Sequence, residues 1–178
     1  DAKQTIERVQ QLGGRVVHEL HTIPGVGTIG HVADLHGAGF AIIQPEPTDA
    51  PPPVAPNTLG HVGWNELHAG DGVKAFAFYS EIFGWTKAET MDMGPMGVYQ
   101  LFSAGAEPIG GMMTKTPDVP APTWSYYFNV DSASAAIERV KSHGGQLLMG
   151  PQEVPGPMYI ACFLDPQGAM FSVVSGQK

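Results

Sequence analysis

Glu66 and His68 could move a proton together, because a carboxylate and an imidazole are common acid and base groups in proteins. They lie two residues apart in 61–69, a run that we predict to be a β-strand. Side chains two residues apart in a strand share a face, so Trp64 lies on the face of both. Three roles stay open for Glu66: a buried carboxylate hydrogen-bonded to a neighbour, with His68 at the rim of the site, a ligand-binding group, or a proton-transfer group.

The other histidines show no recognised ligand spacing. His18 and His21 are separated by two residues, one fewer than in the zinc-protease motif. We expect this pair to lie in a surface loop, because the matching residues of the repeat described below are Met149 and Gln152. The sequence also has no Gly-x-Ser-x-Gly elbow, no phosphate-binding loop followed by Lys-Ser/Thr and no dinucleotide fingerprint.

The composition indicates a globular protein with many short strands. Of 178 residues, 23 are Gly and 16 are Pro, while 43% are hydrophobic. This content of turn-forming residues favours short elements, and the apolar content is sufficient for a core. No apolar run approaches the roughly 18 residues of a membrane span. Cys162 is the only cysteine and has no partner for a disulfide, so we expect a reducing, cytoplasmic setting.

The charge balance argues against polyanionic partners. Lys and Arg together number 9 against 17 Asp and Glu, which gives a formal net charge of −8, and no cluster of basic residues occurs. A nucleic acid or an anionic membrane would need such a cluster. We therefore predict a small-molecule ligand, no nucleic-acid partner and no membrane partner.

Residues 1–44 align with residues 132–175 at a constant offset of 131 and without a gap. The matches include paired glycines, a Pro-Gly pair and an Asp-x-x-Gly turn, so the two segments should fold alike. Helical spacing of apolar residues is followed by Gly-Gly, which predicts a helix and its stop. In the second copy, the strands expected after the helix lie near 146–149, 158–164 and 169–174.

The same order of elements recurs in 61–114 without obvious sequence identity. Asp71 is predicted to cap a helix that stops at Gly84. This helix follows the strand 61–69 and precedes strands expected near 85–93, 98–103 and 108–114. Another aromatic strand is expected over 123–130, before the second copy of the repeat.

A proline-rich segment joins these parts. Six prolines lie within the twelve residues 45–56. A central strand or a helix would be broken by them, so we predict a semi-rigid polyproline II linker over 45–58. A proline-rich recognition motif is the alternative, but the position between two copies of a repeat favours the linker.

Several stretches of the sequence are typical of one superfamily. Residues 63–71 read Gly-Trp-Asn-Glu-Leu-His-Ala-Gly-Asp, and 77–85 read Ala-Phe-Tyr-Ser-Glu-Ile-Phe-Gly-Trp. Residues 165–171 read Asp-Pro-Gln-Gly-Ala-Met-Phe. The chain resembles the glyoxalase/bleomycin-resistance/extradiol-dioxygenase superfamily, also called vicinal oxygen chelate, and most of all its two-domain bacterial members with a Trp-x-Glu-Leu opening.

The resemblance implies an α+β fold in which paired βαβββ units form a cupped mixed sheet around a cavity. Residues 59–178 would then be one complete domain of two units. Residues 1–44 would be the C-terminal half of a truncated domain whose first half precedes Asp1. A half-domain with an uncovered sheet edge should pair with its missing half or with another chain.

The resemblance also implies a metal site with four ligand positions. Metal-dependent members place His or Gln, Glu, His and Glu around one divalent ion, with one ligand from each of four strands. In this sequence the corresponding positions hold no such donor, and the half-domain has Ala41 at its fourth position. The four positions are Trp64, Gly110–Gly111, Ser125 and Ser172. We therefore predict no metal site and no cofactor, and a divalent metal would enter only if this assignment were wrong.

Strand alternation also defines the expected cavity wall. It should combine Trp and Tyr surfaces with a few polar groups, as small-molecule pockets do. The ligand-binding candidates are Trp64, Ser125, Tyr127, Asn129 and Ser172. We expect a protein that binds a small, partly aromatic or apolar molecule. The alternative is a lyase, isomerase or oxygenase-like enzyme that acts through Glu66 and His68 or through an unassigned divalent metal.

Overall fold

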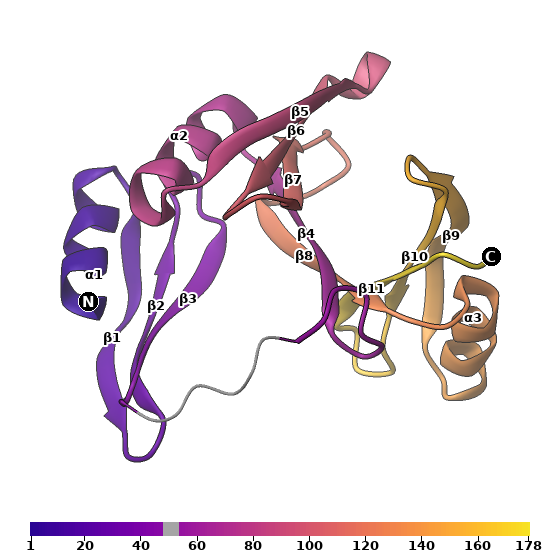
Figure 1. The fold of residues 1–178 in the computed structure, drawn as a ribbon, viewed down its shortest axis with the longest axis horizontal. Helices are drawn as coiled ribbons and strands as arrows, with labels where there is room; N and C mark the ends of the chain where they lie inside the picture. The colour runs from indigo at the N-terminus through magenta and orange to yellow at the C-terminus, as the bar shows by residue number, and fades with distance from the viewer. Residues whose placement is uncertain (48–53) are drawn as a thin grey trace. The chain divides into compact units, whose positions relative to one another are not determined.

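The computed structural model describes residues 1–47 and 54–178, which form an α+β fold with short helices and many strands (Figure 1). The helices are α1 (Ala2–Gln11), α2 (Gly72–Phe83) and α3 (Ala133–Ser142), with a 3-10 turn at Gly94–Met96. The strands are β1 (Arg15–Ile23), β2 (Gly27–Ala33), β3 (Gly39–Pro45), β4 (Val62–Ala69), β5 (Thr86–Asp92), β6 (Val98–Ser103), β7 (Pro108–Thr114), β8 (Thr123–Asn129), β9 (Gln146–Val154), β10 (Met158–Leu164) and β11 (Met170–Ser175).

The strands form two sheets. The first has the order β1-β2-β3, and the second has the order β5-β6-β7-β4-β8-β11-β10-β9. The second sheet is mixed, since β8 and β11 run parallel while β10 and β11 run antiparallel. Within residues 1–47 and 54–178, no helix has the length and apolar character needed to cross a membrane.

Contacts divide the described residues into two compact units, the first made of 1–47 and 67–124 and the second of 54–66 and 125–178. In the first unit, α1 lies on one face of the sheet β1-β2-β3 (Figure 1). Asp1 caps α1 by accepting a hydrogen bond from the Gln4 amide at 2.9 Å. The buried side of α1 joins the core residues of α2, so the 1–44 segment shares a core with 67–124.

Helix α2 has the termini expected from the sequence. The Asp71 carboxylate accepts from the Lys74 amide at 3.0 Å, and Gly84 ends the helix at φ 68°. That left-handed conformation favours glycine, which explains the stop. Four aromatic or small residues of α2 are buried in the first unit: Ala75, Phe76, Phe78 and Tyr79.

A buried hydrogen-bonded chain holds three segments of the first unit together. The Tyr79 hydroxyl on α2 donates to Asp34 Oδ2 at 3.2 Å, and Trp124 Nε1 donates to the Tyr79 hydroxyl at 3.0 Å. Asp34 and Tyr79 are only 2% and 1% exposed. Asp34 Oδ1 accepts from the amides of His36 and Ala38, which closes the turn between β2 and β3. The carboxylate is therefore buried with hydrogen-bond donors on both oxygens, as a buried charge requires.

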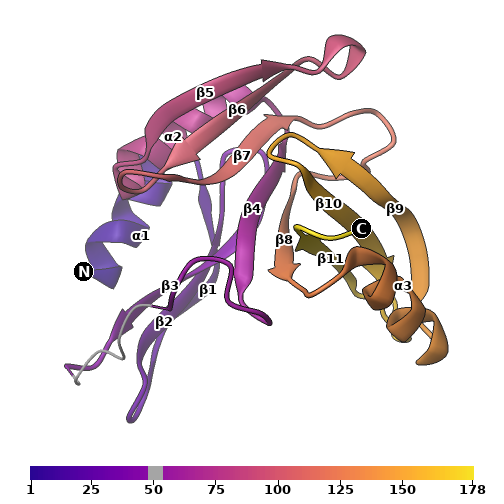
Figure 2. The same cartoon turned by 45° about the vertical axis from the view of Figure 1, so that its right-hand side comes forward.

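In the second unit, α3 lies against β9, β10 and β11 (Figure 2). Ala136 and Ile137 of α3 pack with Ala161, Phe163 and Val173 of the sheet. Because Ala161, Phe163 and Val173 point to the helix, their neighbours in the strands point to the opposite face.

The two aligned segments have the same strand pairing. His18 is the Cα partner of His31 in β1 and β2, and Met149 is the partner of Cys162 in β9 and β10, at the offset of 131. The register shifts around these pairs also coincide. Asp165 Oδ1 accepts from the amides two and four residues on, as Asp34 does. The sequence alignment is thus reproduced in the backbone pairing.

Three expectations from the sequence differ in part from the structure. The prediction of a loop at His18 and His21 is wrong, because both lie in β1. The strand expected near 146–149 continues to Val154. Of the predicted 45–58 linker, Pro45 belongs to β3 and Ala55–Thr58 form a turn, while 48–53 lie outside the described residues.

We predict that Tyr79→Phe lowers the free energy of unfolding by about 1–3 kcal/mol, because Asp34 Oδ2 loses a donor in a buried position. Urea denaturation followed by circular dichroism measures this. Tyr126→Phe is the matched control, since Tyr126 is 44% exposed. Equal stability of the Tyr79 variant and the parent would show that the hydrogen bond contributes nothing.

Candidate functional site

Four side chains from neighbouring strands of the second unit form what we call the polar row: Glu66 on β4, Tyr127 on β8, Ser172 on β11 and Cys162 on β10. The register places Tyr127 beside Ser172 and Ser172 beside Cys162. Cys162 and Ser172 alternate with residues that pack on α3, so their side chains point to the face opposite the helix.

Hydrogen bonds connect the polar row in two pairs. The Tyr127 hydroxyl donates to Glu66 Oε1 at 2.9 Å. The Ser172 hydroxyl donates to Cys162 Sγ at 3.2 Å. Tyr127 and Ser172 are buried, whereas Glu66 and Cys162 are half-buried. The Tyr127 hydroxyl is thus a hydrogen-bond donor to the Glu66 carboxylate, whose oxygens accept hydrogen bonds.

Burial raises the pKa of the Cys162 thiol, and the charge of Glu66 raises it further. The hydrogen bond from Ser172 lowers the pKa, and the nearby Tyr127 hydroxyl lowers it less, but these effects do not outweigh burial. The thiolate is the nucleophilic form of cysteine, so the environment makes Cys162 a weak nucleophile near neutral pH. Cys162 is suited to contact a ligand rather than to attack it.

The structure brings together only part of the predicted site. Glu66, Tyr127 and Ser172 lie in the polar row, while Ser125 is buried elsewhere on β8 and Trp64 is half-buried on β4. Asn129 Nδ2 donates to the Thr58 carbonyl at 3.3 Å, which supports the turn before β4.

His68 belongs to the first unit, whereas Glu66 belongs to the second. The hydrogen bond from the Thr116 side chain is the main cause that holds the pKa of Asp118 below its ordinary value, and the charge of His68 adds a smaller contribution. The charge of His68 thus acts on Asp118, whereas Glu66 accepts a hydrogen bond from Tyr127 and its charge acts on Cys162.

Sequence reasoning missed Cys162 as a member of the site. Its apolar surroundings in 159–164 pointed to a core position. The signal that could have found it is the Asp165-x-x-Gly168 turn, which sets the register of β10 and β11 and so pairs Cys162 with Ser172.

The residues at the four positions that the resemblance assigns to metal ligands do not suit a divalent ion. Indole and hydroxyl groups at Trp64, Ser125 and Ser172 are poor partners for a divalent ion beside carboxylate and imidazole. At the remaining position, a Cβ added to Gly111 would collide with the phenol ring of Tyr99. The space that a ligand side chain would need at 111 is filled by the buried Tyr99.

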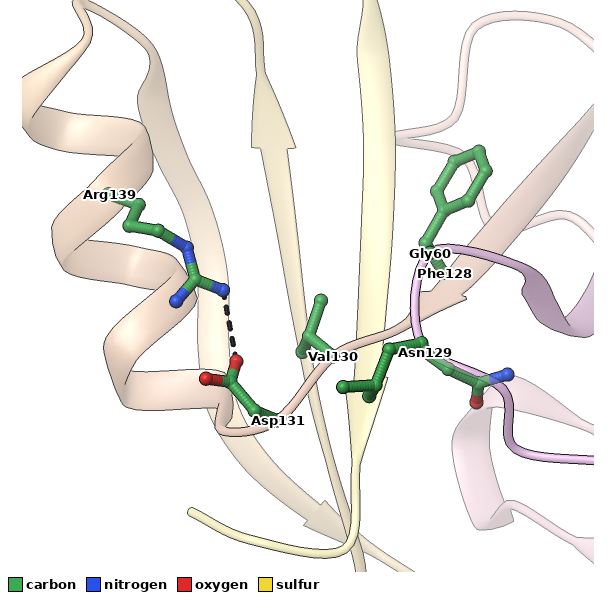
Figure 3. Close-up of a pocket in the computed structure, with 7 residues that line it drawn as sticks. Gly60, Phe128, Asn129, Val130, Asp131 and Arg139 are labelled. Atoms are coloured by element: carbon green, nitrogen blue, oxygen red, sulfur yellow. Dashed lines mark hydrogen bonds and ion pairs between the residues drawn. The ribbon is translucent and has the colours of Figure 1, made fainter.

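An open pocket of about 450 Å³ lies elsewhere in the second unit and is lined by Leu59, Gly60, Phe128, Asn129, Val130, Asp131 and Arg139 (Figure 3). Arg139 Nη2 lies 3.1 Å from Asp131 Oδ1. The hydrogen bond from Arg139 is the main cause that holds the pKa of the Asp131 carboxyl below its ordinary value. Because Asp131 and Arg139 pair with each other, they are less suited to bind a ligand than the polar side chains of the polar row.

We predict that Glu66→Gln shifts the pH–rate profile of Cys162 alkylation by iodoacetamide to lower pH, because a negative charge that disfavours the thiolate is removed. Ser172→Ala should shift the profile to higher pH, because the thiolate loses a hydrogen bond. Mass spectrometry of the alkylated protein gives the rates. Shifts of the same sign in both variants would contradict the arrangement.

We predict that Gly111→Ala lowers the free energy of unfolding by about 1–3 kcal/mol, because the added methyl displaces the Tyr99 ring in a packed region. Gly105→Ala is the control, since a Cβ there meets no atom within 4 Å. Thermal denaturation of both variants tests this. Unchanged stability of Gly111→Ala would mean that position 111 can accept a side chain.

Comparison with known proteins agrees with the fold. Residues 58–173 match the model of the Glyoxalase/Bleomycin resistance protein/Dioxygenase superfamily. A putative glyoxylase, CFP32, of Mycobacterium tuberculosis is 31% identical over 175 residues, which cover 98% of this chain and 66% of that protein. The chain thus spans about two thirds of the length of this relative.

Two further proteins are similar over different lengths. The anthracycline biosynthesis protein DnrV of Streptomyces peucetius is 31% identical over 128 residues, which cover 64% of this chain and 46% of that protein. The Mn(II)-bound glyoxalase of Novosphingobium aromaticivorans superposes with a TM-score of 0.66 at 16% identity, over 99% of this chain and 59% of that one. The family match and the relatives agree with the superfamily motifs found in the sequence. The chain belongs to the glyoxalase/bleomycin resistance protein/dioxygenase superfamily.

Proposed function

We propose that this chain binds a small, partly aromatic or apolar molecule at the polar row, without a metal at the family's four ligand positions. The observation that carries the proposal is the Tyr127 hydroxyl held 2.9 Å from Glu66 Oε1, on the sheet face opposite α3. A carboxylate in this setting can accept hydrogen bonds from a ligand that presents hydroxyl groups. The Tyr127 ring adds an aromatic surface beside it.

The chemistry of the row favours binding over covalent catalysis. The raised pKa of Cys162 keeps the thiol protonated near neutral pH, and Ser172 directs its proton to that sulfur. The charge of Glu66 raises the pKa of Cys162, so this carboxylate disfavours the thiolate rather than activating the thiol. Glu66 is thus the principal polar recognition group, and Tyr127 holds it in position.

The similarity to an anthracycline biosynthesis protein supports a polycyclic, hydroxylated ligand class. Anthracyclines combine fused apolar rings with phenolic hydroxyls, which match an aromatic side chain beside a hydrogen-bond acceptor. An anthracycline is therefore the first probe.

Titration of the protein with an anthracycline, followed by quenching of the ligand's own fluorescence, tests the proposal. We expect saturable binding that EDTA leaves unchanged and that Glu66→Gln weakens about tenfold, because a charged acceptor is replaced by a neutral one. Glu153→Gln, on the exposed part of β9, is the matched control and should bind like the parent. Loss of binding in EDTA, or equal affinity of the two variants, would refute the proposal.

A further inference from the structure

Three histidines lie together on the first sheet, and we call them the histidine patch: His18 and His21 on β1 and His31 on β2. All three are exposed. The ring centroids of His18 and His31 are 5.5 Å apart, and those of His21 and His31 are 6.5 Å apart. Neither the polar row nor the family's ligand positions include these residues.

A β-bulge brings the three rings to one face. In a regular strand, side chains three residues apart point to opposite faces, so His18 and His21 would be separated. Here His18 pairs with His31 while His21 pairs with Ile29, so three steps along β1 match two steps along β2. The extra residue restores His21 to the face of His18. Ala41 is the partner of His31 on β3, and its small side chain leaves the ring of His31 accessible.

The spacing of the rings suits coordination of one ion. With Zn–N bonds of about 2.0–2.1 Å and tetrahedral angles, the centroids of two imidazoles on one zinc lie roughly 5 Å apart. The His18–His31 pair is close to this value. His21 Nδ1 lies 3.5 Å from the Glu19 carbonyl, which favours Nε2 as its metal-binding atom.

In residues 1–47 and 54–178, no group of three or more His, Cys, Asp or Glu side chains is arranged to hold a metal ion. The rings of His21 and His31 are stacked at 12°, so His21 must rotate to join the other two. Rotation of an exposed side chain between staggered rotamers requires no repacking of a core. The centroid distance of His18 and His31 thus suits two ligands of one ion, and His21 is the third ring of the patch.

We propose that the histidine patch binds one divalent ion of the zinc, nickel or copper class, with His18 and His31 as the principal ligands and His21 as the third. Neutral imidazoles are suited to these ions, and water completes the coordination. The second half of the repeat has Met149, Gln152 and Cys162 at the matching positions, so the site belongs to the first half alone. It is independent of the ligand proposed for the polar row.

Isothermal titration with Zn²⁺ and NMR of the imidazole nitrogens test this proposal on the whole chain. We expect one zinc ion to bind and to shift the signals of His18, His21 and His31. His31→Ala should weaken the affinity at least about tenfold, because His31 is the ring shared by both contacts. His18→Ala should also weaken the affinity for zinc. Because His18 is exposed, we expect this variant to fold like the parent.

The matched control is His143→Ala, since His143 is another exposed histidine, at the end of α3. Its affinity for zinc should equal that of the parent. Far-UV circular dichroism establishes that the variants are folded. Equal zinc affinity of His31→Ala, His18→Ala and the parent, or zinc-dependent shifts confined to other histidines, would overturn the proposal.

Discussion

The Tyr79 hydroxyl is the contact on which the first unit depends. It donates to the Asp34 carboxylate in the turn between β2 and β3 and accepts from the Trp124 indole at the start of β8. Because Asp34 is buried, its negative charge would be costly without this donor. The aromatic residues around Tyr79, including Phe40 and Trp85, exclude water from the same region. One α2 side chain thus joins the 1–44 segment to the rest of its unit.

In the second unit, one face of the sheet packs against α3 and the opposite face carries the polar row. Alternate residues of β10 and β11 pack under α3, and the intervening ones build the polar row. At the family's ligand positions the chain has indole, hydroxyl and glycine, and at Gly111 the phenol of Tyr99 occupies the space of a side chain. These groups are poor ligands for a divalent ion. The candidate site instead relies on a carboxylate placed beside a tyrosine.

Much of the fold could be predicted because the residues that begin and end its elements act locally. Asp71 and Gly84 bound α2 as their capping preferences indicate, and short runs between turn residues predicted β6, β7 and β10. Of the site, Glu66, Tyr127 and Ser172 followed from strand periodicity. Cys162 and the position of His18 and His21 did not, because they depend on cross-strand register. An extra residue in β1 changes which face a side chain occupies, and no single-strand pattern reveals it.

The bulge shared by the two aligned segments has a consequence for how these proteins diversify. Since the irregularity recurs at the same place in β1 and in β9, the backbone provides three equivalent side-chain positions in each half. One half carries imidazoles there and the other carries a thioether, an amide and a thiol. The same backbone geometry can therefore carry unrelated chemistry in the two segments by substitution alone, with no change in chain length.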